Sequence, residues 1–167
     1  MGLERTLPRD FYFSPELYRQ EQERIFWREW FCAGREEELP SPGDYVQLDV
    51  AGQSVLVVRT KDGALAAHYN VCRHRGSRLV LGELTKIDMG DRCAPMGTFV
   101  GAIRCPYHSW TYELDGRLRT APYLTESDGV RKEDFSLYPV GIDTWGGFFF
   151  LNLTPQEAAM QGHTLAA

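Results

Sequence analysis

Short runs of alternating hydrophobic and polar residues fill most of the chain. Such runs, separated by turn residues, are typical of β-strands in an antiparallel arrangement. The predicted strands cover residues 31–34, 45–48, 54–60, 65–70, 102–104, 109–114, 117–119, 137–142 and 145–153. Turn residues separate several of them, as in Pro42-Gly43-Asp44 and Lys61-Asp62-Gly63. The pattern therefore predicts an all-β domain.

The segment before the first predicted strand has helical spacing instead. Ser14 can cap free backbone N–H groups, Pro15 is tolerated in a first helical turn, and Glu16 favours the positive end of the helix dipole. Hydrophobic residues at roughly helical spacing follow, including Leu17 and Ile25. We predict a helix that ends near Glu29 and presents an aromatic face.

Composition and charge narrow the function classes. The chain has 167 residues, of which 43% are hydrophobic and 25% charged, as expected for one globular domain. Its net charge of −5 and the absence of a Lys/Arg run argue against nucleic-acid binding. It has no secretory signal pattern and no apolar run of about 18 residues, so we expect no membrane association and a cytoplasmic location.

Two of the four cysteines have a histidine nearby. Cys72-Arg73-His74 and Cys105-Pro106-Tyr107-His108 each lie in a segment typical of a tight loop, with residues 75–104 between them. Cys32 lies in an apolar run and is expected to be a small buried hydrophobe, whereas Cys93 has no assigned role. Disulfides would require an oxidising compartment, which nothing in the sequence indicates.

The residues Cys72, His74, Cys105 and His108 supply two thiolates and two imidazoles, the ligand set of a Rieske [2Fe-2S] centre. Two thiolates hold one iron of that centre and two histidines hold the other, and the cluster carries one electron. The same donors also suit tetrahedral zinc, although zinc fingers usually pair their cysteines and their histidines separately. A redox cluster is the leading hypothesis, and a structural zinc module for protein binding is the metal alternative.

The residues around both motifs resemble the Rieske domain of ring-hydroxylating oxygenase α subunits. The resemblance is carried by the segments from Asn70 to Ser77, Cys105 to Leu118 and Trp145 to Leu153, and an aromatic N-terminal helix also fits. It implies an antiparallel β-sandwich with a small subdomain of two cluster-binding loops. The implied organisation is an N-terminal helical segment at 1–30, the Rieske domain at 31–153, and a truncated tail or the start of a missing catalytic domain at 154–167.

The resemblance also assigns ligands and partners. Cys72 and Cys105 would bind one iron, His74 and His108 the other, and His108 would face the catalytic iron of a neighbouring subunit in a full-length homotrimer. The electron donor would be an NAD(P)H-dependent flavin reductase or a ferredoxin. Electrons would reach a mononuclear Fe(II) that hydroxylates an aromatic ring or demethylates a quaternary amine such as betaine.

This chain has no residues for that second iron site. After His108 only His163 remains, and no Asp-x-x-His followed by another His is present. The mononuclear iron is therefore expected only in a missing catalytic domain of the same or a neighbouring subunit, and the chain alone is the electron-entry part. A stand-alone Rieske ferredoxin is the alternative, although such carriers are usually shorter and lack the aromatic helix.

Two differences from respiratory-complex Rieske proteins indicate the subclass. Those proteins carry an extra cysteine in each loop, and the two form a disulfide. Ser77 and Tyr107 occupy the matching positions here, so this disulfide cannot form. Trp110 stands where those proteins have a serine whose hydroxyl raises the potential, so we expect a low reduction potential.

Several other residues carry milder expectations. The connection at residues 81–98 is longer than usual for the family and is expected to be a tolerated surface insertion or a docking loop. Arg73 and Arg75 are expected either to lie near the cluster, where they tune its field or contact a partner, or to be merely solvated. Trp110 is expected to shield the cluster by packing, and His68 to be a structural hydrogen-bonding residue.

Overall fold

The computed structural model of the chain describes residues 6–82, 96–124 and 131–155. Its helical elements are α1 (Asp10–Phe13), α2 (Pro15–Glu21), the π-helix η1 (Gln22–Phe26), and the 3-10 helices η2 (Glu36–Glu38) and η4 (Lys132–Phe135). Its strands are β1 (Phe31–Arg35), β2 (Asp44–Val50), β3 (Gln53–Arg59), β4 (Leu65–Tyr69), β5 (Met96–Thr98), β6 (Ile103–Arg104), β7 (Thr111–Tyr112), β8 (Leu118–Thr120), β9 (Pro139–Trp145) and β10 (Phe148–Asn152).

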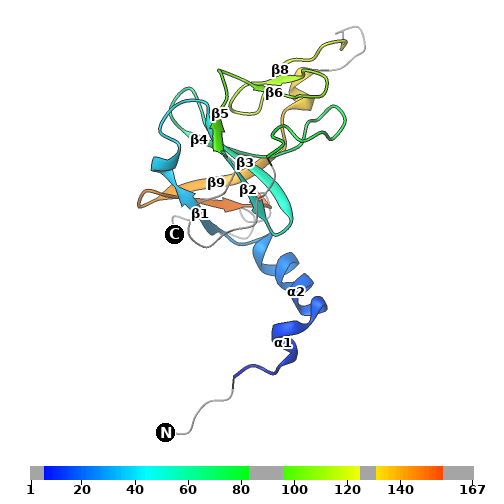
Figure 1. Ribbon diagram of the computed structural model, residues 1–167, viewed down its shortest axis with the longest axis vertical. Helices are drawn as coiled ribbons and strands as arrows, with labels where there is room; N and C mark the ends of the chain where they lie inside the picture. Colours follow the sequence, from blue (N-terminus) through cyan, green and yellow to red (C-terminus); the bar gives the residue numbers. More distant parts are fainter. Residues whose placement is uncertain (1–5, 83–95, 125–130, 156–167) are drawn as a thin grey trace.

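The strands form two antiparallel sheets of different size. The larger has seven strands in the order β1-β10-β9-β4-β3-β2-β5, and the smaller has three in the order β6-β7-β8. In sequence, the small sheet lies between β5 and β9, and Figure 1 places it at the end of the molecule opposite α1 and α2. The all-β fold and the small inserted subdomain predicted from the sequence are confirmed.

Strand β3 is buried on both faces and separates two hydrophobic cores. Val55 and Val57 pack in the core that also contains Phe149, on one face of the large sheet. Leu56 and Val58 point to the other face, where they pack in a second core with residues of the small sheet. Because successive side chains of a strand point to opposite faces, this one strand contributes to both cores.

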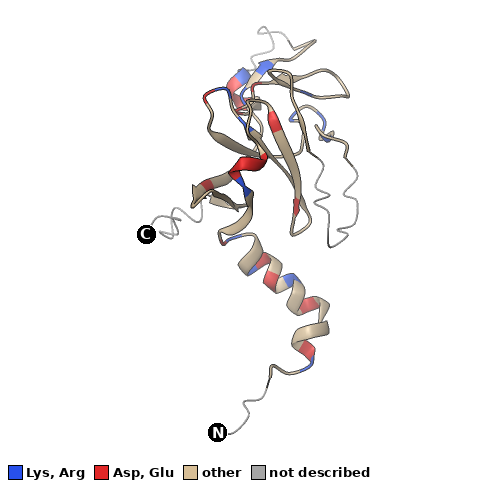
Figure 2. Ribbon diagram, turned by 60° about the vertical axis from the view of Figure 1, so that its left-hand side comes forward, with Lys and Arg blue, Asp and Glu red and all other residues tan. Residues whose placement is uncertain are grey.

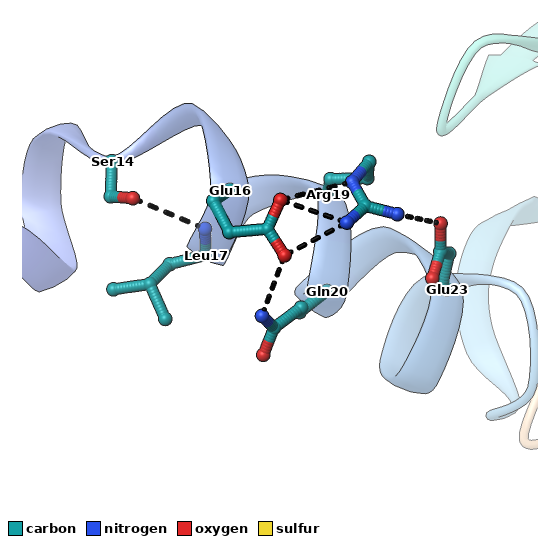
Figure 3. A network of polar contacts seen from close by, with 6 residues as sticks. All are labelled: Ser14, Glu16, Leu17, Arg19, Gln20 and Glu23. Carbon is teal, nitrogen blue, oxygen red and sulfur yellow. Dashed lines mark hydrogen bonds and ion pairs between the residues drawn. The ribbon is translucent and has the colours of Figure 1, made fainter.

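The N-terminal helices extend away from the sheets as an arm (Figure 1). The Ser14 hydroxyl caps α2 by accepting a hydrogen bond from the Leu17 N–H at 3.3 Å, as predicted. Arg19 bridges Glu16 and Glu23 at 2.8 and 3.0 Å, and Figure 3 shows this network along the helix. Figure 2 shows acidic and basic residues interspersed along the arm. No helix in the described ranges is long and apolar enough to cross a membrane.

The predicted helix ends earlier than expected. The α-helical part stops at Glu21, and a π-helical turn follows in which the Trp27 N–H donates to the Gln22 carbonyl at 3.0 Å. Beyond this wider turn, the Trp27 indole donates to the Ala51 carbonyl at 3.3 Å, and the side-chain amide of Asn152 on β10 donates to the Arg28 carbonyl at 2.7 Å. These contacts attach the base of the arm to the large sheet.

The prediction that Cys32 is buried was wrong. Cys32 is exposed, whereas its neighbours Phe31 and Ala33 pack against the core. The alternation of side chains along β1 turns the thiol outward. The short strand β5 was not predicted either: Gly97 at its centre faces Tyr45 on β2 and breaks the hydrophobic alternation. Residues 83–95 of the predicted insertion, which include Cys93, lie outside the described residues.

Candidate metal centre

The two Cys/His loops lie side by side at the small sheet. Cys72 and Cys105 each expose only 2% of their surface, and both are free thiols. The rings of His74 and His108 lie at the same site, with their centroids 4.9 Å apart. The structure thus brings together all four residues that the sequence singled out.

Both loops close with the same backbone hydrogen bonds. The Cys72 N–H donates to the Ser77 carbonyl at 2.8 Å, and the Cys72 carbonyl accepts from Gly76 at 3.0 Å. In the second loop, the Cys105 N–H donates to the Trp110 carbonyl at 2.8 Å, and its carbonyl accepts from Ser109 at 3.1 Å. Each cysteine therefore begins a loop of the same design, which explains why the two thiols are presented in the same way.

The fifth residue of each loop, counted from its cysteine, has a left-handed backbone. Gly76 has φ +71° and Ser109 has φ +60°. This conformation costs a side chain about 1–2 kcal/mol, so glycine suits the first loop and serine is strained in the second. The Ser109 hydroxyl accepts a hydrogen bond from the Arg104 guanidinium at 2.9 Å, which ties this residue to β6.

An aromatic ring lies against each histidine. Trp110 is 3% exposed, and its ring lies almost parallel to that of His74, at 4.8 Å between centroids and 8° between planes. The centroid of the Tyr107 ring lies 3.7 Å from that of the His108 ring, and Tyr107 is itself exposed. Trp110 therefore holds one imidazole from the protein interior, as expected of a shielding residue, whereas Tyr107 covers the other from the solvent side.

Asn70 closes the first loop through its side chain. Its carbonyl oxygen accepts from the backbone N–H groups of Leu79 and Val80 at 2.9 and 3.0 Å. Its amide nitrogen donates to the Val80 carbonyl at 3.0 Å and to the Ser54 hydroxyl at 3.1 Å. The residue is 3% exposed, so these bonds satisfy its polar atoms in a buried position. Sequence reasoning did not single out Asn70 as a site residue, although an Asn two residues before Cys72 is visible in the sequence.

Tyr112 connects the small sheet to the first thiol. Its hydroxyl lies 3.2 Å from Cys72 Sγ and accepts a hydrogen bond from the Arg73 N–H at 3.1 Å. Burial raises the pKa of Tyr112 above its usual value, and the neighbouring Cys72 raises it further. Burial also raises the pKa of the Cys72 thiol, while the hydrogen bond from Tyr112 opposes that shift. The sequence offered no signal for this contact except the position of Tyr112 in a predicted strand.

The side chains of Arg73 and His68 both make contacts within the protein. The Arg73 guanidinium donates to the carbonyls of Ser136 and Asp134 at 2.7 and 3.2 Å and lies 4.0 Å from the centre of the Tyr138 ring. His68 is 4% exposed, and its Nε2 lies 3.4 Å from the Leu114 carbonyl. The expectation that His68 is a structural hydrogen-bonding residue is confirmed.

The residues at the site fit a cluster held by two thiolates and two imidazoles. Nδ1 of His108 is buried without a hydrogen-bond partner, as a metal-ligating nitrogen would be in the protein alone. No three His, Cys, Asp or Glu side chains within the described ranges converge on one metal ion. Two thiolates and two imidazoles are the donor set that a Rieske cluster takes from its protein.

Comparison with known proteins agrees with this geometry. The family model of the Rieske [2Fe-2S] domain matches residues 29–132. The chain is 36% identical to the carnitine monooxygenase oxygenase subunit of Acinetobacter baumannii, over 93% of this chain and 38% of that protein. It is 38% identical to the glycine betaine monooxygenase oxygenase subunit of Pseudomonas aeruginosa, over 93% of this chain and 33% of that protein.

Solved structures give the same result. A quaternary ammonium Rieske monooxygenase superimposes with a TM-score of 0.77 at 36% identity, over 89% of this chain and 39% of that one. Naphthalene 1,2-dioxygenase from Rhodococcus sp. superimposes with a TM-score of 0.73 at 32% identity, over 87% of this chain and 31% of that one. The chain spans about two fifths of the length of the first relatives it matches. The chain belongs to the family of Rieske [2Fe-2S] domains, and its relatives are oxygenase subunits.

Proposed function

We propose that Cys72 and Cys105 bind one iron of the [2Fe-2S] cluster and that His74 and His108 bind the other. The observation that carries this assignment is the pair of matching loops, which brings two buried thiols and two adjacent imidazoles to one site. When bound, such a cluster takes up and releases a single electron. The function of this chain is therefore electron transfer.

The protein residues shape the two sides of the site differently. The cysteines are buried beside Trp110 and Tyr112, which exclude water from the sulfur atoms. His74 is exposed, so its imidazole edge reaches the surface where a redox partner can approach. The histidine side is therefore the side through which we expect electrons to enter and leave.

The electrons would serve oxygenase chemistry at a mononuclear non-haem iron in a catalytic domain of the same or a neighbouring subunit. The relatives include oxygenase subunits for carnitine and glycine betaine, and also biphenyl 2,3-dioxygenase of Rhodococcus jostii, which is 34% identical over 84% of this chain. We propose a quaternary amine as the substrate class, because the amine oxygenases are similar over more of the chain. A flavin reductase or ferredoxin would supply the electrons in the cytoplasm, in a homotrimeric assembly.

Spectroscopy tests the ligand assignment. Anaerobic loading with iron and sulfide should give a coloured protein with two irons per chain, whose visible bands bleach with dithionite. Cys72→Ser and Cys105→Ser should lose the bands, whereas Cys32→Ser, which changes an exposed thiol, should keep them. A colourless protein that binds one zinc ion would refute the assignment.

Substrate turnover tests the oxygenase role. The protein expressed from its natural gene, supplied with NADH and a flavin reductase, should consume carnitine or glycine betaine faster than biphenyl. Turnover of biphenyl alone would exclude the amine assignment. A cluster that is reduced without any oxygen-dependent turnover would favour the stand-alone carrier.

A further inference from the structure

Arg73 reaches from the first cluster loop to a third segment of the chain, at the end of η4. Its guanidinium donates to the carbonyls of Asp134 and Ser136 at 3.2 and 2.7 Å. The guanidinium carbon also lies 4.0 Å from the centre of the Tyr138 ring and 5.9 Å from that of the Phe135 ring. A planar guanidinium suits both kinds of contact, because it donates in fixed directions and stacks on aromatic rings. Arg73 therefore attaches the first loop to this segment at several points.

The same segment supports the second loop through an aromatic contact. The rings of Phe135 and Trp110 are nearly perpendicular, with 75° between their planes and 5.7 Å between their centroids. Edge-to-face pairs of this kind are a preferred arrangement of aromatic rings. Trp110 in turn lies almost parallel to the His74 imidazole, at 4.8 Å between centroids. Because His74 directly follows Arg73 in the chain, the contacts close a circuit, and we call these four residues the contact circuit.

The third segment is itself fixed to both sheets. The Leu137 N–H donates to the carbonyl of Gly116, in the turn between β7 and β8, at 2.8 Å. The Tyr138 carbonyl accepts from the N–H of Tyr69, the last residue of β4, at 3.0 Å. Leu137 is also 4% exposed and packs in the core that contains the small sheet. The segment is therefore a firm support for the side chains that lean on it.

We propose that Phe135 and Arg73 are positioning residues for the His74 ligand, and that Phe135 acts through Trp110. The inference rests on the proposed ligand assignment and adds how the exposed histidine is held. His74 is exposed and Trp110 is buried, so the parallel contact fixes the plane of the imidazole from the interior side. Residues that orient a metal ligand from outside are commonly worth about 10- to 100-fold in metal affinity.

Substitution of Phe135 tests the aromatic contact. In the cluster-loaded chain, Phe135→Leu should accelerate iron release to a chelator about tenfold, whereas Phe135→Tyr keeps the ring and should stay within about twofold of the unmodified protein. The matched control is Phe148→Leu on β10, because the Arg35 guanidinium lies 5.0 Å from the Phe148 ring in a similar pair on the large sheet. Equal acceleration in Phe148→Leu would count against the contact circuit.

Pulsed electron paramagnetic resonance of the dithionite-reduced protein gives a readout that general destabilisation would not move. The nitrogen hyperfine couplings of histidine ligands depend on the orientation of each imidazole plane. Phe135→Leu should shift or broaden the coupling of one histidine and leave that of the other unchanged. Phe135→Tyr should preserve both couplings. The expected result is thus specific to one ligand, and equal changes in both couplings would contradict the proposal.

Arg73 distinguishes positioning from an effect of charge. Arg73→Lys keeps the positive charge but loses the planar fork that reaches the two carbonyls. Arg73→Gln loses both. Positioning predicts that the two variants accelerate iron release by similar factors, about fivefold. A normal rate in Arg73→Lys together with fast release in Arg73→Gln would mean that Arg73 acts through its field, and would refute its positioning role.

A double variant tests the route through Trp110. If Phe135 acts on His74 only by holding Trp110, then Trp110→Leu combined with Phe135→Leu should release iron no faster than Trp110→Leu alone. Two effects that multiply would show independent contacts and would refute this route.

The unmodified protein separates failure of this proposal from failure of the ligand assignment. If the loaded, unmodified chain shows no histidine nitrogen couplings, the assignment is refuted and the positioning role with it. If its couplings are normal and remain unchanged in Phe135→Leu, only the positioning role is refuted.

Discussion

The hydroxyl of Tyr112 lies 3.2 Å from Cys72 Sγ, in a part of the small sheet that excludes solvent. A hydrogen bond to a cluster-ligating sulfur stabilises the reduced, more negative form. Tyr112→Phe should therefore lower the reduction potential by about 50 mV, corresponding to a bond worth about 1 kcal/mol in a one-electron couple. A dye-mediated titration measures this shift.

The matched control for this prediction is Tyr69→Phe. It removes a hydroxyl that hydrogen-bonds to the Leu153 carbonyl at 3.0 Å, away from the sulfur atoms. Its potential should stay within about 10 mV of the unmodified protein. A Tyr112→Phe protein with unchanged potential would mean that the hydroxyl serves only the Arg73 backbone.

Asn70 should contribute strongly to stability and cluster retention. Asn70→Ala leaves the buried N–H groups of Leu79 and Val80 without a partner, and each such loss costs about 1–3 kcal/mol. The free energy of unfolding should fall by about 3 kcal/mol in a denaturant titration, and iron loss to a chelator should accelerate. Asn70→Asp keeps the acceptor oxygen, so its free energy of unfolding and its rate of iron loss should lie between those of Asn70→Ala and the unmodified protein. Equal iron loss from Asn70→Ala and the unmodified protein would show that the first loop closes without this side chain.

The left-handed residues of the two loops give opposite predictions. Ser109→Gly should raise the free energy of unfolding by up to about 1 kcal/mol, because relief of the strain at φ +60° is only partly offset by loss of the exposed hydrogen bond from Arg104. Gly76→Ala should lower it by about the same amount, since open space around Gly76 leaves backbone strain as the only cost. Urea titrations of the two variants measure both effects. If both variants changed the free energy of unfolding in the same direction, the correspondence between the two loops would be contradicted.

Stability should fall at mildly acidic pH because of His68. Burial lowers the pKa of His68 in the folded protein below its unfolded value of about 6.5. The unfolded state therefore binds more protons below that pH, so stability is complete above it and is lost as the pH falls toward the folded pKa. The difference in unfolding free energy between pH 7.5 and 5.5 should be larger in the unmodified protein than in His68→Asn. The same pH dependence in both proteins would assign the loss to other groups.

The sequence predicted the parts of the site that depend on local chemistry. Cys72, His74, Cys105 and His108 were identifiable because their offsets are short and their donor atoms are specific. Tyr112 and Asn70 were not, because their roles depend on contacts with residues far away or on loop closure. Cys32 was misjudged because an apolar run at a sheet edge does not reveal which face is covered. The inward engagement of Arg73 likewise depends on the distant segment around Ser136.

Because β3 contributes side chains to both hydrophobic cores, the two sheets should unfold together. Separating the small sheet from the large one would expose Leu56 and Val58, on the strand whose other face holds the opposite core together. The metal-binding end should therefore not melt as an independent unit, and a single transition should accompany release of the cofactor. Exchange of the β3 amides with deuterium should be among the slowest in the chain and should report on the whole fold at once.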